Sequence, residues 1–558
     1  MCTTGRPQSS TCSASITNGS PTAIRAGSSG SPTSTARSSR ACSPKPAAVN
    51  RAGTTPASDT FSFGSWLFLR SLALIHFIAF TSAWIQLNGL IGPHGLLPAQ
   101  PFFHAVQEQL GAAAYYQLPS LCWIFGAGKF LPALCAAGGA LSLLLFAGIA
   151  PAPCLALLWA AYLSLCGAGQ VFFNFQWDAL LLETTLLAIF LAPWSLLPLW
   201  RAPAPPRVAR WLLVWLFFRL MFLSGLVKLT SGDPTWRNLS ALTIHYETQP
   251  LPTQFAWFVH QLPGWFHRAS CAGMFVIELI APFCLFAPRA FRHRAALLIA
   301  ILMLLIALTG NYTFFNLLTL ALCLPCLDDA WWTSACPRFA RILLSSDRLW
   351  PPRVSQSLVD TLFDATAGVC HAPRWVLGAV AALVIPFTVL QALPSVTRRP
   401  VLPELLGALV NGVAPFRSLN NYGLFAVMTN PRLELIFEGS DDGRDWRAYE
   451  FPDKPGDLAH RPTWVAPHQP RLDWQLWFAA LGSPAQNRWV LHLCEHLLRG
   501  TPDVLALFAT NPFAQKPPRF VRVVRYEYHF TDPATRARSG QWWRRTPLDF
   551  YVQPASLK

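Results

Sequence analysis

Residues 219–263 read RLMFLSGLVKLTSGDPTWRNLSALTIHYETQPLPTQFAWFVHQLP. The stretch begins as an apolar helix that carries two charges, Arg219 and Lys228, and Ser-Gly-Asp-Pro at 231–234 ends that helix. The part that follows is too polar to lie in lipid, and it is denser in Trp, Tyr, His and Pro than a passive connector. These residues therefore predict a membrane helix followed by a structured loop.

The composition of the whole chain agrees with a membrane protein. Apolar residues make up 53% of the 558 positions and charged residues 13%, about half the ~25% of a soluble domain. Several apolar stretches reach the ~20 residues that a helix needs to cross a bilayer. We therefore expect an α-helical polytopic membrane protein rather than a series of soluble domains.

The net charge of +16 could also indicate a nucleic-acid-binding protein. The arginines, however, cluster in the short segments between apolar stretches, as the positive-inside rule describes for membrane proteins. We therefore expect the lipid bilayer to be a partner of this chain, and we expect no nucleic acid.

About nine transmembrane helices are predicted from the apolar stretches, and the shorter stretches define the count least well. They form a transmembrane helical domain over 61–396 that is interrupted by the polar loop 230–268. The expected spans are 66–87, 130–149, 153–168, 177–197, 211–229, 269–286, 295–309, 314–327 and 375–393.

Lysine and arginine positions predict the orientation of these spans. The basic N-terminal tail is expected on the cytoplasmic side, and alternation then leaves three arginine clusters, around Arg207, Arg292 and Arg341, on that same side. With nine spans, loop 230–268 and everything after 394 would face the exoplasmic side, which is the lumen of the endoplasmic reticulum or the periplasm.

Two further segments flank the transmembrane domain. Residues 1–60 are rich in Ser, Thr, Pro and Arg and nearly lack apolar runs, which predicts a disordered low-complexity tail. A transit peptide or an over-extended start site would have the same composition. Residues 420–553 contain two alternating apolar stretches, 432–437 and 520–530, with helical spacing of aromatic residues between them. They predict a C-terminal soluble α+β or β-sandwich-like domain on the exoplasmic side.

Four charged residues lie in two consecutive predicted spans. Asp178 and Glu183 approach from the exoplasmic end of one span, and Arg219 and Lys228 lie on the next. At ~1.5 Å per residue, Asp178 lies level with Lys228, and Arg219 is within side-chain reach of Glu183. An arginine facing lipid costs about 2.5–3.5 kcal/mol, so we predict the pairs Glu183–Arg219 and Asp178–Lys228. Their role is either helix packing or a functional site such as a proton relay or a substrate site.

Motifs of known enzyme chemistry are missing from the sequence. There is no Gly-rich phosphate loop, no metalloprotease motif, no serine-hydrolase elbow and no paired CxxC. Cys323 and Cys326 have the spacing of a redox pair, but they end an apolar helix, where cysteines are ordinarily small buried side chains. We therefore expect no catalytic residue, no metal site and no cofactor.

Two aromatic stretches have the composition of a protein-interaction surface. One lies in loop 230–268, and the other is WVAPHQPRLDW at 464–474, whose rings could equally form the core of the C-terminal domain. The candidate partner-binding residues are Trp236, Tyr246, Glu247, Trp464, His468, Arg471 and Trp474.

The opening stretch resembles the lipase maturation factor family in RLMFLSGLVKL, SGDPTWRNL and HYETQPLP. The resemblance continues in FNFQWDALLLET (173–184), NYTFFNLLT (311–319), NNYGLFAVMT (420–429) and WVAPHQPRLDWQLWFAALG (464–482), and it covers roughly 62–550. It implies a multi-pass protein of the endoplasmic reticulum membrane that helps secreted lipases, notably lipoprotein lipase, to reach an active fold. The C-terminal domain is implicated in client binding, and no catalytic residue comes with the family.

Two features depart from the family. The tail 1–60 has no counterpart in it, and the Ala-, Leu- and Arg-rich composition is typical of a bacterium, in which the membrane would be the cytoplasmic one. A bacterial client would then be a protein other than lipoprotein lipase.

The sequence supports two hypotheses about function. We expect a chaperone-like maturation factor for exported client proteins, with lipases as the class that the resemblance indicates. The alternative is a membrane enzyme or transporter with an intramembrane polar site around Arg219 and Glu183.

Overall fold

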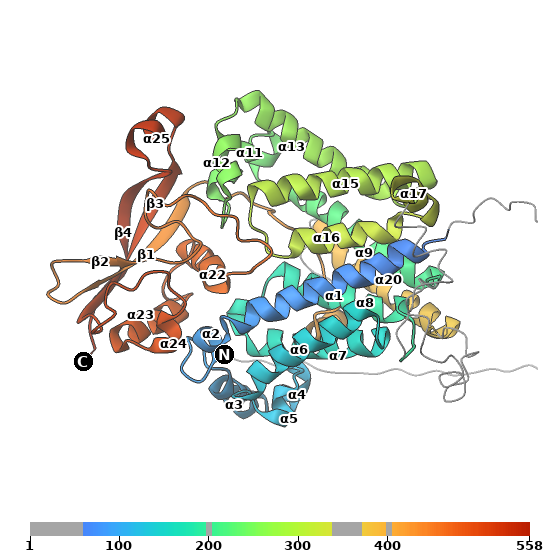
Figure 1. Ribbon diagram of the computed structural model, residues 1–558, viewed down its shortest axis with the longest axis horizontal. Helices are drawn as coiled ribbons and strands as arrows, with labels where there is room; N and C mark the ends of the chain where they lie inside the picture. The colour runs from blue at the N-terminus through green and yellow to red at the C-terminus, as the bar shows by residue number, and fades with distance from the viewer. Residues whose placement is uncertain (1–59, 197–203, 338–370, 398–403, 558) are drawn as a thin grey trace, which may run out of the picture. The chain divides into compact units, whose positions relative to one another are not determined.

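The computed structural model describes residues 60–196, 204–337, 371–397 and 404–557 (Figure 1). The predicted tail 1–60 therefore lies outside the described residues except for Thr60, and so does the arginine cluster around Arg341. The first part of the chain is helical, and a sheet with four helices follows after residue 430.

The helices of the first part follow the apolar stretches of the sequence. Their bounds are α1 Ser62–Trp84, α2 Leu87–Ile91, α3 Ala99–Leu110, α4 Ala114–Gln117, α5 Cys122–Phe125, α6 Phe130–Ala147, α7 Pro151–Ala168, α8 Gln176–Leu191, α9 Arg207–Thr230, α10 Pro234–Arg237, α11 Ala241–Thr248, α12 Gln254–His260, α13 Gly264–Leu279, α14 Ala281–Cys284, α15 Arg289–Thr309, α16 Phe315–Cys323, α17 Asp329–Ala335, α20 Arg374–Thr397 and α21 Glu404–Val413.

Six helices among the described residues are long and apolar enough to cross a membrane: α1, α6, α7, α9, α15 and α20. The expected count of nine is therefore not supported. The other three expected spans are shorter helices, and each stops close to a proline. α8 has 16 residues and ends before Pro193, the span expected at 269–286 is divided into α13 and α14 near Pro282, and α16 ends before Pro325. Proline lacks the backbone N–H that continues a helix and disfavours helical geometry at the residue before it.

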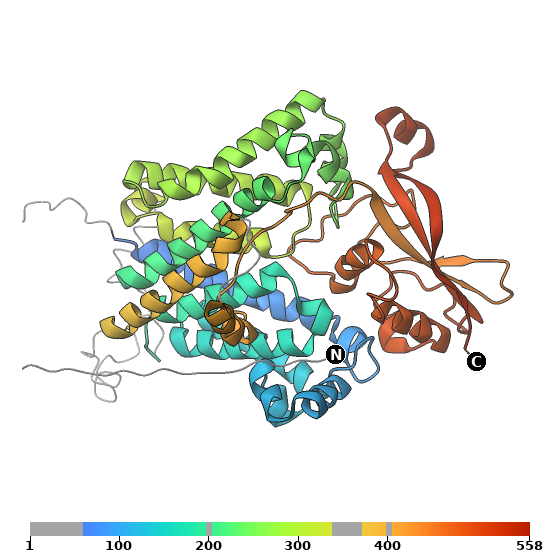
Figure 2. The same ribbon diagram turned by 180° about the vertical axis from the view of Figure 1, so that it is seen from behind.

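The long helices pack closely against one another. α1 lies along α6 and α16, and α9 lies along α8, α13 and α20, as Figure 2 shows for α9 and α20. Gly138 of α6 allows the close approach of α1, because a Cβ atom at this position would lie 2.5 Å from the ring of Phe80. Small residues at helix crossings are a general means of packing in membranes.

The C-terminal part is built on one four-stranded antiparallel sheet in the order β2-β1-β3-β4 (Figure 1). The alternating stretch at 432–437 forms β1, which pairs with β2 as a hairpin, with Phe437 of β1 opposite Tyr449 of β2. The elements are β1 Arg432–Ser440, β2 Arg447–Tyr449, α22 Arg471–Ala480, α23 Trp489–Arg499, α24 Pro502–Leu505, β3 Phe520–Phe530, α25 Pro533–Ser539 and β4 Trp543–Ala555.

Burial along strand β3 differs from the expected simple alternation. Val521 and Val523 are buried at its start, whereas Tyr528 and Phe530 are buried at its end. β3 pairs with β1 without interruption, and the extra residues at its register shifts with β4 lie on β4, so the side chains of β3 keep alternating between the two faces of the sheet. The buried set changes parity because different faces are covered at the two ends of β3. Its start packs against the domain's own core, and its end packs toward α11 and α12.

Candidate functional site

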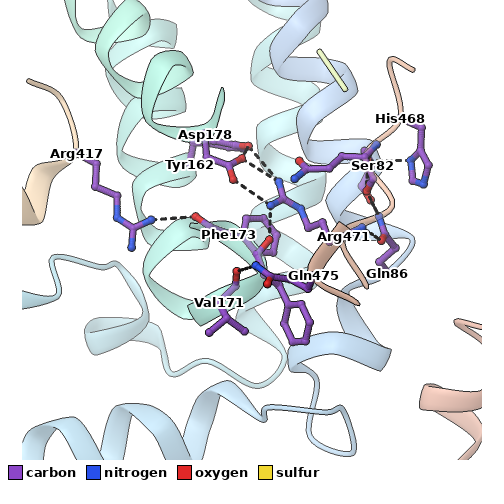
Figure 3. A network of polar contacts seen from close by, with 12 residues as sticks. Ser82, Gln86, Tyr162, Val171, Phe173, Asp178, Arg417, His468, Arg471 and Gln475 are labelled. Carbon is purple, nitrogen blue, oxygen red and sulfur yellow. Dashed lines mark hydrogen bonds and ion pairs between the residues drawn. The ribbon is translucent and has the colours of Figure 1, made fainter. Parts of the chain in front are cut away.

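Arg471 joins the C-terminal domain to the membrane helices. It lies at the start of α22 and is 1% exposed, yet its guanidinium reaches α8 and the turn before it (Figure 3). Nη2 donates to Asp178 Oδ1 at 3.0 Å, and Nη1 donates to Asp178 Oδ2 at 3.2 Å and to the Phe172 carbonyl at 2.7 Å. Tyr162 donates its hydroxyl to the same carboxylate at 2.5 Å. A bidentate arginine–carboxylate pair of this kind fixes both distance and orientation.

The segment before Arg471 is held on the end of α1 by further hydrogen bonds (Figure 3). Ser82 Oγ lies 2.9 Å from His468 Nδ1 and accepts from the backbone N–H of Gln469 at 2.9 Å. Gln86 donates to the Gln469 carbonyl at 2.7 Å and accepts from the Arg471 N–H at 2.8 Å. These contacts dock the 464–474 stretch on the membrane helices.

Arg219 and Glu183 form the expected ion pair, buried between α9 and α8. The pair is completed by a third segment, because Glu183 Oε2 accepts from the Tyr422 hydroxyl at 2.7 Å and from the backbone N–H of Asn420 at 3.0 Å. Arg219 donates to the Asn420 carbonyl at 2.9 Å. Sequence reasoning did not assign Asn420 or Tyr422 to this network, although both lie in the NNYG motif.

The predicted pair Asp178–Lys228 is wrong. Lys228 instead donates to both carboxylate oxygens of Glu278 on α13, at 2.8 and 2.6 Å, while Asp178 binds Arg471. α9 and α13 approach closely at Gly225, where a Cβ atom would lie 2.9 Å from Glu278 Cβ. This contact brings a carboxylate to Lys228 from a helix 50 residues away in sequence.

Loop 230–268 and the C-terminal sheet share a polar interface. Arg432 at the start of β1 is fully buried, pairs with Glu434 at 2.7 Å and donates to the carbonyls of Glu247 and Pro250 at 2.7 and 2.8 Å. The Glu247 carboxylate in turn lies 2.9 Å from His529 Nδ1 and accepts from the Phe530 N–H at 2.7 Å. α11 is thus tied to both β1 and β3.

Aromatic side chains fill the rest of this interface. Tyr246 and Trp257 of the loop share a buried cluster with Tyr528, Phe530 and Trp543 of the sheet. Burial beneath the sheet withdraws these rings from solvent, and aromatic pairs add to the stability beyond the area they bury. The loop and the sheet therefore form a single packed unit.

The seven candidate partner-binding residues divide by exposure. Trp236, Tyr246, Arg471 and Trp474 are buried, so the expected exposed patch does not include them. The reason is that the rings of Tyr246 and Trp474 pack against neighbouring aromatic side chains, and that Trp236 and Arg471 use their polar atoms to hold the loop and the 464–474 stretch in place. Glu247 and His468 are partly buried, and Trp464 is 52% exposed.

Trp464 belongs to an exposed aromatic group that joins two distant segments. Its ring lies edge-on to Phe255 of α12, with centroids 6.3 Å apart, and Phe258 follows one turn later on the same helix. Phe255 and Phe258 are 39% and 49% exposed. We refer to Phe255, Phe258 and Trp464 as the aromatic rim. The loop's Phe residues were not among the sequence candidates, although their i, i+3 spacing places them on one helical face.

Asn311 holds the backbone around Trp464, a role that the sequence did not indicate. It accepts from the N–H groups of Val465 and Ala466 at 2.7 and 3.0 Å and donates to the Thr463 carbonyl at 2.8 Å. One buried amide thereby fixes the backbone directly after Trp464. Among the described residues, no group of three or more His, Cys, Asp or Glu is placed to hold a metal ion.

Comparisons with known proteins cover both parts of the chain. The model of the lipase maturation factor transmembrane domain matches residues 63–334, and that of the lipase maturation factor C-terminal domain matches 418–553. Lipase maturation factor 2 of Homo sapiens is 37% identical over 590 residues, which cover 88% of this chain and 82% of that protein. Lipase maturation factor 1 of Bos taurus is 35% identical, covering 89% and 90%, and that of Homo sapiens is 35% identical, covering 92% and 93%. No solved structure matches the chain.

Proposed function

Because the chain belongs to the lipase maturation factor family, we propose that it is a membrane-embedded maturation factor for exported lipases. The observation that carries this function is the match of both family domains, together with 35–37% identity to lipase maturation factors 1 and 2 over most of the chain. The similar proteins are named as maturation factors rather than as enzymes. The function is accordingly a chaperone-like one, exerted on a client protein.

The aromatic rim is the surface that we assign to client contact. A few hot-spot residues, which are enriched in Trp and Tyr, carry most of the binding energy of a protein interface, and truncating one of them costs about 2 kcal/mol or more. Phe255 and Trp464 come from the loop and from the C-terminal domain, so a client bound there would touch both. Trp236, Tyr246, Arg471 and Trp474 then act as positioning residues beneath the surface, and Glu247 and His468 lie at its border.

The alternative of a membrane enzyme or transporter around Arg219 and Glu183 is not supported. Both side chains are buried, and their charges are engaged with each other and with Asn420 and Tyr422. A network that ties α8, α9 and the 420–422 segment together is what a structural role requires.

For localisation, we propose the endoplasmic reticulum membrane, or the cytoplasmic membrane if the source is bacterial. The N-terminus would be cytoplasmic and the C-terminal domain exoplasmic. Support comes from the ends of α9 and α15, which both begin at arginines and both end at loop 230–268. Arg210 and Arg292 bond to carbonyls of the same turn, at Pro325 and Cys326, so the basic ends lie together.

Client co-purification tests this function directly. Tagged protein is isolated from membranes of cells that export a lipase, and bound exported proteins are identified by mass spectrometry. We expect a lipase in the native sample and at least a tenfold loss for Phe255→Ala combined with Trp464→Ala. Phe550→Ala is the matched control, since Phe550 is 44% exposed on strand β4 of the same domain. Recovery of no exported client with the native protein would overturn the proposal, and equal loss in the control would overturn the assignment of the rim.

A further inference from the structure

A cavity of about 910 Å³ lies between the membrane helices and the C-terminal domain. Its walls come from α9, α13, α15 and α16, from loop 230–268 and from α22. This volume is at the upper end of the ~300–1,000 Å³ that ligand pockets ordinarily have. Apolar side chains such as Leu220, Met274, Ile277 and Leu302 dominate the lining.

The cavity wall has no net charge. Lys228 and Glu278 are the charged side chains of the lining, and they neutralise each other through two hydrogen bonds. His245 lies 3.1 Å from the Tyr312 hydroxyl, and burial, together with the nearby Lys228, lowers the pKa of His245 to about 4. An anionic or cationic ligand would therefore find no counter-charge on this wall, and burying it would carry a desolvation cost.

The cavity adjoins a surface that lipid must cover. Leu305 and Leu308 of α15 line it and are 55% and 38% exposed, and Ile301 and Leu304 continue the same exposed apolar face. α15 is one of the six helices long and apolar enough to span a membrane, and α13 packs beside it (Figure 1). At Gly273 of α13, which also lines the cavity, an added Cβ atom would meet nothing within 4 Å. Exposed residues of both α13 and α15 therefore line the cavity, which places its opening to the bilayer at these two helices.

Four polar atoms on lining residues are buried without a hydrogen-bond partner. They are the indole nitrogens of Trp177 and Trp474, whose rings lie 4.7 Å apart, and the side-chain oxygens of Gln176 and Asn316. Buried polar groups of this kind ordinarily have partners. Ester carbonyls accept hydrogen bonds, as the two indole donors require, and a hydroxyl can donate to an amide oxygen of Gln176 or Asn316. A peptide segment would instead bring a repeating series of N–H and C=O groups that this wall cannot match.

We propose that the cavity binds the acyl chains of an uncharged glycerolipid, of the diacylglycerol class, which enters from the bilayer between α13 and α15. The chains lie against the apolar wall, and the ester or hydroxyl groups lie toward Trp177, Trp474 and Asn316. Because α22 forms one wall, bound lipid also contacts the C-terminal domain. This inference does not depend on the proposed client, and lipid binding can be measured without one.

The test uses a photoactivatable diacylglycerol and the full-length protein in phosphatidylcholine nanodiscs. Labelled peptides are mapped by mass spectrometry for the native protein and for Gly273→Phe, which places a ring at the entrance. Gly378→Phe on α20 is the matched control, since it is also an exposed helical glycine with an open Cβ position that does not line the cavity. We expect labels on α13, α15 and α22, reduced at least fivefold by Gly273→Phe and unchanged by Gly378→Phe.

Several results would overturn the proposal. One is equal labelling in the two glycine variants, and another is labelling confined to helices outside the cavity. A photoactivatable phosphatidylglycerol with the same chains should label the cavity weakly, so equally strong labelling would refute the preference for an uncharged lipid. Crosslinking of an exported polypeptide to α13 and α15 in place of lipid would assign the cavity to a client segment. If Gly273→Phe does not fold, Ser270→Leu one turn earlier serves as the blocking variant.

Discussion

Replacing Arg471 by leucine should release the C-terminal domain from the membrane helices. The substitution removes both bonds to Asp178, the bond to the Phe172 carbonyl and the contact of the guanidinium with the Phe173 ring, which lies 3.4 Å away. Asp178 is fully buried, and among the described residues Tyr162 would remain as its hydrogen-bond partner.

The size of the effect follows from the burial of this ion pair. Removing one member of a buried pair costs about 3–5 kcal/mol, because the other charge is left uncompensated. If the whole of this cost falls on the state in which the C-terminal domain is packed on the membrane helices, the equilibrium between that state and the released state shifts by a factor of about one hundred to several thousand. Exchanging both residues for leucine removes the buried charge altogether, so Asp178→Leu combined with Arg471→Leu should recover most of the loss.

Hydrogen–deuterium exchange of the purified protein is the appropriate assay, with α22 and α8 as the reporting segments. The control is Arg525→Leu, because Arg525 forms an ion pair with Asp549 that is partly exposed to solvent, and such surface pairs contribute about 0–1 kcal/mol. We expect rapid exchange in α22 for Arg471→Leu and native-like exchange for the control. Exchange no faster than in the control, or no recovery in the double variant, would refute the reasoning.

Three further predictions concern charge, pH and topology. Reversing Glu183 or Arg219 alone should abolish monodisperse protein on size-exclusion chromatography, and reversing both should restore part of it; a double variant no better than the singles would contradict the pairing. Burial, reinforced by Asp473, raises the pKa of Asp453 to about 7, compared with about 3.9 in an unfolded chain. The folded state therefore keeps a proton that the unfolded state loses, so stability should fall as pH rises from about 4 to 7. The melting temperature should follow this decline, and Asp453→Asn should flatten it. The same pH profile in the native protein and the variant would contradict the assignment to Asp453. Finally, Asn238 is exposed and begins the glycosylation sequon Asn-Leu-Ser. Expression in a eukaryotic cell should therefore give a glycosidase-sensitive mass shift that Asn238→Gln removes. If the native protein shows no such shift, the loop is not exoplasmic.

The agreement between sequence and structure is best where the pattern is local. Apolar stretches indicated α1, α6, α7, α9, α15 and α20, and alternation indicated β1 and β3, because hydropathy and period depend on neighbouring residues. Helix lengths were less predictable. The stretches that became α8, α13 and α16 were apolar enough to suggest spans, but prolines end or divide them earlier than hydropathy implies.

The aromatic candidates illustrate a different limit. Trp474 and Trp464 stand ten positions apart in one stretch with the same composition, yet one is 3% and the other 52% exposed. An aromatic-rich composition indicates that the rings are removed from water, but it does not distinguish burial in the domain core from burial against a binding partner. The tertiary contacts of Arg471, Gln469 and Asn311 decide which face of the stretch is covered.

By itself, the sequence determined the membrane class, the positions of the longest helices, two strands of the C-terminal domain and the family. Each of these depends on local patterns or on motifs that are read along the chain. Only the tertiary structure decided which charges meet. Asp178 lies 293 residues from Arg471, and Lys228 pairs with Glu278 rather than with the carboxylate on the preceding span. A buried charge takes the partner that packing brings within about 3 Å, and that choice depends on how distant segments fold together rather than on spacing along a helix.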